Sequence, residues 1–130
     1  MAGTTIYMTS QKQKSLQEIH EKIHYIKDAE QVSKLAQTIN DVTIWTLVYE
    51  KYFMRNGSYA SVTVVLTDFG QEQTASIIAA GGGNGIVNLS FGANRNFAKS
   101  VVKVLEDCGF TVTESDLDMN AKGLVERFLE

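Results

Sequence analysis

The spacing of apolar residues along the chain predicts helices first and strands afterwards. Over 16–26, apolar residues recur every three or four positions, which is typical of one face of an amphipathic helix. Ser15 opens a Ser-Leu-Gln-Glu capping box, in which hydroxyl and carboxylate satisfy amide groups at a helix start. Residues 32–39 repeat the helical spacing on nearly the opposite side. We therefore expect a second helix that Asp28 caps and that ends at 40–41.

From Val42 onward, apolar and polar residues alternate, and this period of two indicates β-strands. The strands are expected to follow one another as an antiparallel meander, with turns rich in glycine, asparagine and polar residues between them. Their predicted ranges are 42–55, 58–69, 74–80 and 86–91, and a short stretch at 4–9 also has strand-like composition.

The Asn56-Gly57 dipeptide predicts a type I′ turn, because both residues tolerate its positive φ angles. A two-residue turn there pairs Arg55 with Ser58 and, further along, Leu47 with Leu66, which sets the register of the hairpin. The face of the first strand that should point into the core carries Trp45, Leu47, Tyr49 and Phe53. The opposite face is rich in hydroxyl groups and is expected to meet water or a partner.

The apolar stripe from Phe97 to Cys108 predicts a helix that starts near Asn94 and that Gly109 ends. A weaker amphipathic pattern over 117–128 suggests a short terminal helix. Together the patterns predict one α+β domain spanning 1–130, a four-stranded antiparallel meander sheet with helices packed on one face.

Composition narrows the classes of function. The 130 residues are 44% hydrophobic and 21% charged, with a net charge of −3. The sequence lacks the dense positive stripe that binding to nucleic acid requires. It also lacks an apolar run that approaches the ~20 residues of a membrane-spanning helix. The single Cys108 cannot form an internal disulfide, and the first residues lack the pattern of a secretory signal, so we expect a cytoplasmic protein.

His20-Glu21-x-x-His24 matches the H-E-x-x-H pattern, in which two imidazoles on one helix face hold zinc while the glutamate activates water. The pattern has only three fixed letters. A helical wheel places His20 beside the apolar stripe and His24 further toward solvent, and no third ligand stands at a diagnostic spacing. We therefore expect no metal and no cofactor, with a zinc-dependent hydrolase as the alternative.

Five residues at 81–85 form a glycine-rich loop, which we interpret as a strand connection because strand-like residues follow it instead of a helix. In a meander this loop shares one end of the sheet with the turn at 56–57. There the Arg55 side chain and the loop amides could hold a small anion beside an apolar wall formed by Tyr52, Met54 and Tyr59. Alternatively, this wall packs against a second subunit. The candidate ligand-binding residues are Tyr52, Met54, Arg55, Asn56, Tyr59, Gly82, Gly83 and Asn84.

Three short motifs occur in order: Glu-Lys-Tyr-Phe-Met-Arg-Asn at 50–56, Ala-Ala-Gly-Gly-Gly-Asn-Gly at 79–85, and Phe-Gly-Ala at 91–93 before a helix that ends at 108–110. In this succession, residues 42–110 resemble a small bacterial family of uncharacterised domains of unknown function. The resemblance implies a sheet with a packed helix, and it transfers no catalytic residue.

The sequence contains no nucleophile elbow, no cysteine cluster and no histidine outside the first predicted helix. We therefore expect a binding or interaction module instead of an enzyme. It is expected to form a homodimer through the outer sheet face or the terminal helix, and to contact a small anionic ligand at the hairpin and glycine-loop end of the sheet.

Overall fold

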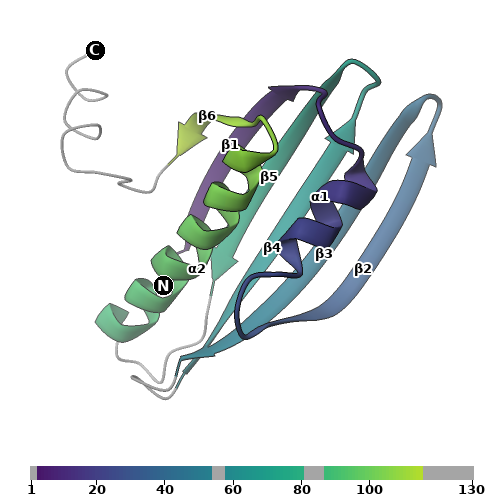
Figure 1. The fold of residues 1–130 in the computed structure, drawn as a ribbon. Helices are drawn as coiled ribbons and strands as arrows, with labels where there is room; N and C mark the ends of the chain where they lie inside the picture. Colours follow the sequence, from purple (N-terminus) through teal and green to yellow (C-terminus); the bar gives the residue numbers. More distant parts are fainter. Residues whose placement is uncertain (1–2, 54–57, 81–86, 116–130) are drawn as a thin grey trace, which may run out of the picture.

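The computed structural model describes residues 3–53, 58–80 and 87–115. Its elements in chain order are β1 (Thr4–Gln11), α1 (Leu16–Ile23), β2 (Ala29–Ile39), β3 (Val42–Phe53), β4 (Ser58–Asp68), β5 (Glu72–Ala80), α2 (Val87–Asp107) and β6 (Thr111–Ser115). All strands in this part of the chain join one antiparallel sheet in the order β2-β3-β4-β5-β1-β6, and both helices lie on the same face of it (Figure 1). The α+β class is confirmed, but the sheet has six strands and not four.

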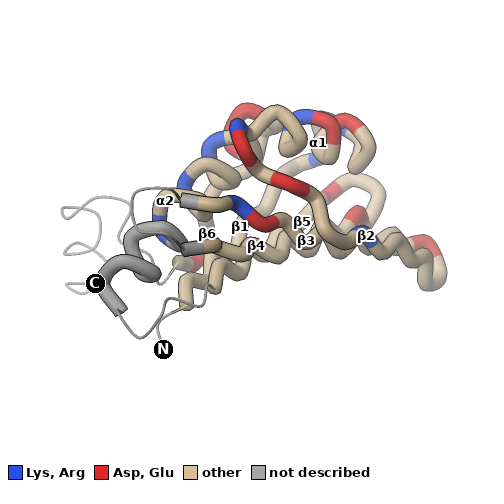
Figure 2. Tube along the Cα trace, turned by 90° about the horizontal axis from the view of Figure 1, so that it is seen from below, with Lys and Arg blue, Asp and Glu red and all other residues tan. Residues whose placement is uncertain are grey.

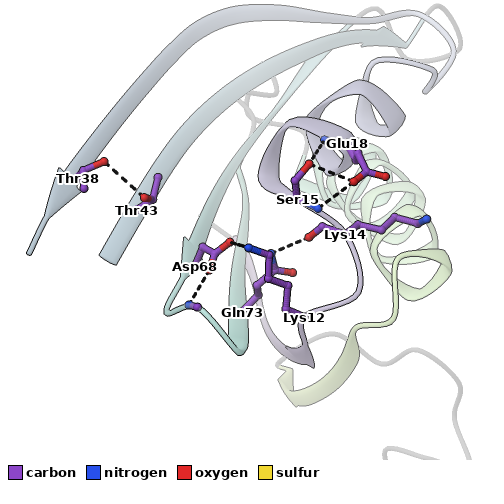
Figure 3. A network of polar contacts seen from close by, with 9 residues as sticks. Lys12, Lys14, Ser15, Glu18, Thr38, Thr43, Asp68 and Gln73 are labelled. Carbon is purple, nitrogen blue, oxygen red and sulfur yellow. Dashed lines mark hydrogen bonds and ion pairs between the residues drawn. The ribbon is translucent and has the colours of Figure 1, made fainter. Parts of the chain in front are cut away.

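The segment predicted as a second helix is strand β2. Asp28 and Asn40 adopt positive φ angles of 64° and 55°, and Ile39 pairs with Val42 across a two-residue turn. Asparagine and aspartate tolerate this left-handed backbone better than other non-glycine residues, so the segment 40–41 reverses the chain as a hairpin turn. The Thr38 hydroxyl lies 3.4 Å from the hydroxyl of Thr43, its cross-strand partner on β3 (Figure 3).

Two features of β2 explain why the spacing of its apolar residues predicts a helix. The strand lies at the edge of the sheet, and most of its residues are exposed on both faces, so burial imposes no strict alternation. In addition, the register with β3 shifts between Gln31 and Ser33, which makes Val32 a bulged residue. One extra residue in a period of two produces apolar spacings of three, the spacing that the sequence pattern attributed to a helix turn.

The strand predicted over 86–91 is also wrong, because α2 already begins at Val87. The helix predicted from Asn94 is confirmed but starts earlier and runs to Asp107. Its end matches the prediction: Gly109 has a φ angle of 97°, and the amides of Gly109 and Phe110 donate back to carbonyls of the last helical turn. This pattern is a Schellman cap, which requires a left-handed residue. The terminal helix predicted over 117–128 lies outside the described residues.

The β3–β4 register differs from the predicted one by two residues. Phe53, and not Arg55, pairs with Ser58, and Leu47 pairs with Val64. The predicted pairing across a two-residue turn at 56–57 is therefore wrong, although 54–57 lie outside the described residues. An even shift keeps every side chain on its original face. The predicted core face is confirmed for Leu47 and Tyr49, which are buried.

The core lies between the sheet and the helical layer. Leu16, Ile19 and Ile23 of α1 are buried there, together with the α2 stripe that includes Phe97 and Leu105. The predicted capping box starts α1: the Ser15 hydroxyl accepts from the Glu18 amide at 3.1 Å, and the Glu18 carboxylate accepts from the Ser15 amide at 3.2 Å (Figure 3). In the described part of the chain, no helix is long and apolar enough to cross a membrane.

A polar network fixes the loop between β1 and α1. Gln73 is completely buried and donates to the Lys14 carbonyl at 2.8 Å and to the Asp68 carboxylate at 3.2 Å (Figure 3). Asp68 also forms an ion pair with Lys12 at 3.0 Å and accepts from the Gly70 amide at 2.7 Å. These contacts join the entrance of α1 to the β4–β5 turn.

Candidate functional site

The structure describes two of the eight predicted ligand-binding residues. Tyr52 and Tyr59 pair across β3 and β4, their ring centroids lie 4.9 Å apart, and both side chains are exposed. They lie on the sheet face opposite the helices, as predicted. Met54, Arg55, Asn56, Gly82, Gly83 and Asn84 lie outside the described residues, so the anion site stays a prediction. The argument that a strand follows the glycine-rich segment is wrong, because α2 follows it.

The sheet face opposite the helices, here called the outer face, has no helix over it among the described residues (Figures 1 and 2). Threonine, serine and valine side chains occupy its centre, between β3, β4, β5 and β1. Its exposed large apolar side chains are Tyr7, Leu35, Ile39, Tyr52, Tyr59 and Ile78.

The charged side chains that the described strands place on the outer face have one sign. The strand registers place four charged residues there within the described ranges, and all are acidic: Glu30, Glu50, Glu72 and Glu114. They lie toward the margins, on edge strands or near strand ends. The lysines of the described strands, Lys34 and Lys51, are on the helical side. Figure 2 shows most coloured segments in the helical layer and few along the strands.

His20 on α1 and His24, the C-cap residue of this helix, form a close pair. Their Nε2 atoms are 3.0 Å apart and their ring centroids 4.5 Å apart. Residues four apart lie on adjacent turns of one face, so the two side chains meet, although the helical wheel correctly predicted His20 beside the apolar stripe and His24 toward solvent. His20 is buried, with 8% of its surface exposed, whereas His24 is exposed. The pair thus connects solvent with the edge of the core.

Strands β2 and β3 provide the surroundings of the pair. Gln31 Oε1 is in hydrogen-bond contact with His20 Nε2, and the Tyr49 hydroxyl donates weakly to the same oxygen at 3.5 Å. The Trp45 ring lies edge-on to His20, with the centroids 5.6 Å apart, and Lys34 Nζ lies 4.2 Å from the Trp45 centroid. Burial raises the pKa of Tyr49 to about 12. A polar chain therefore runs from exposed His24 to a phenol that stays neutral at physiological pH.

The hydrogen bonds assign the tautomer of His20. Because a carbonyl oxygen only accepts, His20 Nε2 carries the hydrogen that Gln31 Oε1 receives. The other ring nitrogen, Nδ1, is buried without a partner and is left as a bare acceptor, which costs less than an unpaired donor. The Nε2 atom of His24, 3.0 Å away, then faces this hydrogen with its lone pair, because a ring nitrogen that carries a hydrogen cannot accept one.

The glutamate of the H-E-x-x-H pattern is engaged elsewhere. The Glu21 carboxylate is exposed and accepts from the Gln17 amide at 3.1 Å. Among the described residues, no three histidine, cysteine, aspartate or glutamate side chains come together in a metal-binding group. The structure thus brings the two imidazoles together without the general base that zinc-dependent hydrolysis uses.

Comparison with known protein families decides the classification. The model of a family described as "Family of unknown function (DUF6054)" matches residues 1–109. The chain belongs to the DUF6054 family. The predicted resemblance is thus confirmed, and the match extends beyond 42–110 to include β1, α1 and the histidine pair. No curated protein matches the chain significantly.

This DUF6054 domain also has a polar groove that sequence reasoning missed. It has a volume of about 320 Å³ and is lined by Thr9, Ser10, Gln11, Gln13, Glu72, Gly109 and Thr111. The lining comes from β1, β5, β6 and two loops, and no local motif connects these segments. Cys108, next to Gly109 in the chain, is buried, and burial raises the pKa of its thiol.

Proposed function

We propose that this DUF6054 domain is a homodimeric interaction module that associates through the outer face of its sheet. The observation that carries the proposal is a broad face of apolar and hydroxyl side chains that no described element covers. Large apolar side chains such as Ile78 and Leu35 are exposed on it. Exposed apolar patches of this extent are typical of interaction surfaces.

The dimensions of the face fit a stable dimer. Six strands at about 4.8 Å spacing, and eight residues per strand at about 3.4 Å, give a surface of roughly 24 Å by 27 Å. This area of about 650 Å² is close to the ~800 Å² that each partner contributes to a standard interface. Two such faces would pack about 10 Å apart, as the two sheets of a β-sandwich do.

The charges of the face give the dimer a characteristic salt response. The charged residues that the described strands would bring to the interface margin are all carboxylates, so like charges would approach each other in a face-to-face arrangement. Added salt screens this repulsion and leaves the apolar contact intact. We therefore expect the dimer dissociation constant to decrease as ionic strength rises from about 0.05 M to about 0.5 M.

Sedimentation equilibrium with a substitution on an interior strand tests the proposal. Ile78 lies between Thr5 and Thr63 on the outer face and is 43% exposed, so Ile78→Lys should leave the monomer folded. Desolvating the new ammonium at the interface should raise the dissociation constant at least ~100-fold. Tyr25→Lys is the matched control, because Tyr25 is 86% exposed and lies in the α1–β2 loop.

Wild type and Tyr25→Lys should be dimers, and Ile78→Lys should be a folded monomer by circular dichroism. A wild-type protein that remains monomeric at about 0.1 mM would refute the proposal. So would an Ile78→Lys variant that dimerises as tightly as wild type.

A small anionic ligand at the tyrosine end of the outer face is part of the same proposal. The contact between Tyr52 and Tyr59 supports an aromatic wall there. Arg55 is the residue that we expect to bind the anion. A screen of carboxylates and phosphates by thermal shift should find stabilisation of wild type that Arg55→Ala loses, and an unchanged shift in that variant would exclude the site.

A further inference from the structure

The histidine pair has the arrangement of a bidentate nitrogen ligand. His20 and His24 lie one turn apart, in the last turn and at the C-cap of α1, a helix whose start is fixed by a capping box. Their Nε2 atoms face each other at 3.0 Å, and exposed His24 leaves one side of the pair open to solvent. Two histidines at this spacing on one helix face are a recurrent metal-binding unit. They are the two histidines of the chain, so no other imidazole competes with them.

The distance between the two nitrogens in the metal-free pair favours one class of metal. An ion bound at about 2.1 Å from each of two nitrogens 3.0 Å apart makes a nitrogen–metal–nitrogen angle of about 90°. A tetrahedral ion at the same bond length needs the nitrogens about 3.4 Å apart. An angle of 90° is the cis angle of square-planar and tetragonal complexes, which Cu²⁺ and Ni²⁺ prefer and structural Zn²⁺ does not. Between the two, Cu²⁺ binds nitrogen ligands more tightly.

We propose that His20 and His24 bind Cu²⁺ through their Nε2 atoms, with water in the solvent-facing coordination positions. Binding requires His20 to move its hydrogen from Nε2 to Nδ1, so that the ring stays neutral and its lone pair faces the ion. Gln31 Oε1, which accepts that hydrogen in the metal-free pair, becomes available as an oxygen donor beside the ion. The buried Nδ1 has no acceptor, so the site is weaker than a closed four-ligand site.

The chain contains a reporter for this site. Trp45 is its single tryptophan, and its ring centroid lies 5.6 Å from that of His20. A paramagnetic Cu²⁺ ion at the pair should therefore quench the tryptophan fluorescence. Titration of the full chain with copper sulfate in a non-coordinating buffer should give saturable quenching at one ion per chain. Electron paramagnetic resonance of the complex should show hyperfine coupling to two imidazole nitrogens.

Two variants test whether the pair is the ligand. His24→Gln keeps an exposed polar side chain and removes one nitrogen, and it should weaken Cu²⁺ binding more than ~10-fold. The double variant His24→Tyr with Tyr25→His keeps the composition and both histidines but breaks the four-residue spacing, and it should weaken binding similarly. Both positions are exposed, so both variants should retain the wild-type melting temperature without metal.

Three outcomes would overturn the proposal. The first is binding by the double variant as tight as by wild type. The second is a Cu²⁺ spectrum that lacks two-nitrogen coupling. The third is Zn²⁺ binding as tight as Cu²⁺ binding, since the 90° angle would then have no influence. Dimerisation is measured separately with Ile78→Lys, which should bind Cu²⁺ like wild type because Ile78 lies on the opposite face of the sheet.

Discussion

Gly109 ends α2 in a backbone conformation that other residues adopt at a cost, and Gly109→Ala measures that cost. At a φ angle of 97°, a Cβ atom strains the backbone by about 1–2 kcal/mol. The smaller conformational freedom of unfolded alanine offsets about 0.4–1 kcal/mol of this. A built Cβ would also lie 2.6 Å from Gln13 Cδ, so the Gln13 side chain must leave its place in the groove.

The expected loss for Gly109→Ala is therefore about 1–2 kcal/mol, which corresponds to roughly 4–8 °C in melting temperature for a domain of this size. Urea denaturation at fixed protein concentration, to hold the monomer–dimer equilibrium constant, measures it. Gly70→Ala is the matched control: Gly70 has a φ angle of 105° with no atom within 4 Å of a built Cβ, so it reports backbone strain alone, about 1 kcal/mol.

The double variant Gly109→Ala with Gln13→Ala separates the two contributions. Removing the Gln13 side chain should bring the loss at Gly109 close to the loss at Gly70, since only the strain remains. A Gly109→Ala protein as stable as wild type would refute the reasoning, because the Schellman cap would then not depend on a residue without a Cβ.

Two further predictions concern pH. Burial alone would raise the pKa of Asp68, but hydrogen bonds from Lys12, a turn amide and Gln73 outweigh it and lower the pKa below its usual value. Ionised Asp68 thus stabilises the fold above its unfolded pKa of about 3.9, and this stabilisation is lost as the pH falls through the lower folded pKa. In a plot of the urea unfolding midpoint against pH, Asp68→Asn should therefore reduce the decrease at acidic pH. Burial raises the pKa of Tyr49 to about 12. The contribution of its neutral phenol to the free energy of unfolding is therefore complete below the unfolded pKa of about 10, and it is lost as the pH rises through the folded pKa of about 12. Absorbance at the phenolate band should show a tyrosine that titrates near pH 12 and that Tyr49→Phe removes, and ionisation of Tyr49 near its unfolded value of about 10 would contradict this.

Local sequence rules predicted the elements whose stabilising contacts are local. The capping box at Ser15 and the left-handed Gly109 each depend on residues within one helical turn, and both were identified correctly. The core face of β3 was also correct, since alternation places Leu47 and Tyr49 on one side whatever the exact register. These predictions needed no knowledge of the distant partners.

The errors arose where distant segments decide the structure. The bulge at Val32 and the exposed edge position gave β2 a helical spacing. The position of β1 between β5 and β6 depends on pairings with residues far along the chain, such as Ile6 with Ile77. The helical wheel correctly placed His20 against the apolar stripe and His24 toward solvent, but it does not show that side chains one turn apart lean toward each other, so the contact between the two rings was missed.

The place of β1 inside the sheet has a consequence for biosynthesis. Strand β1 is synthesised before both of its neighbours, β5 and β6, so its apolar residues Ile6 and Met8 stay unpaired until β5 has been made. Closure of the sheet over such sequence separations is slow compared with hairpin formation. The β2–β3–β4–β5 hairpins can form as soon as they emerge, and they then provide the template on which β1 docks.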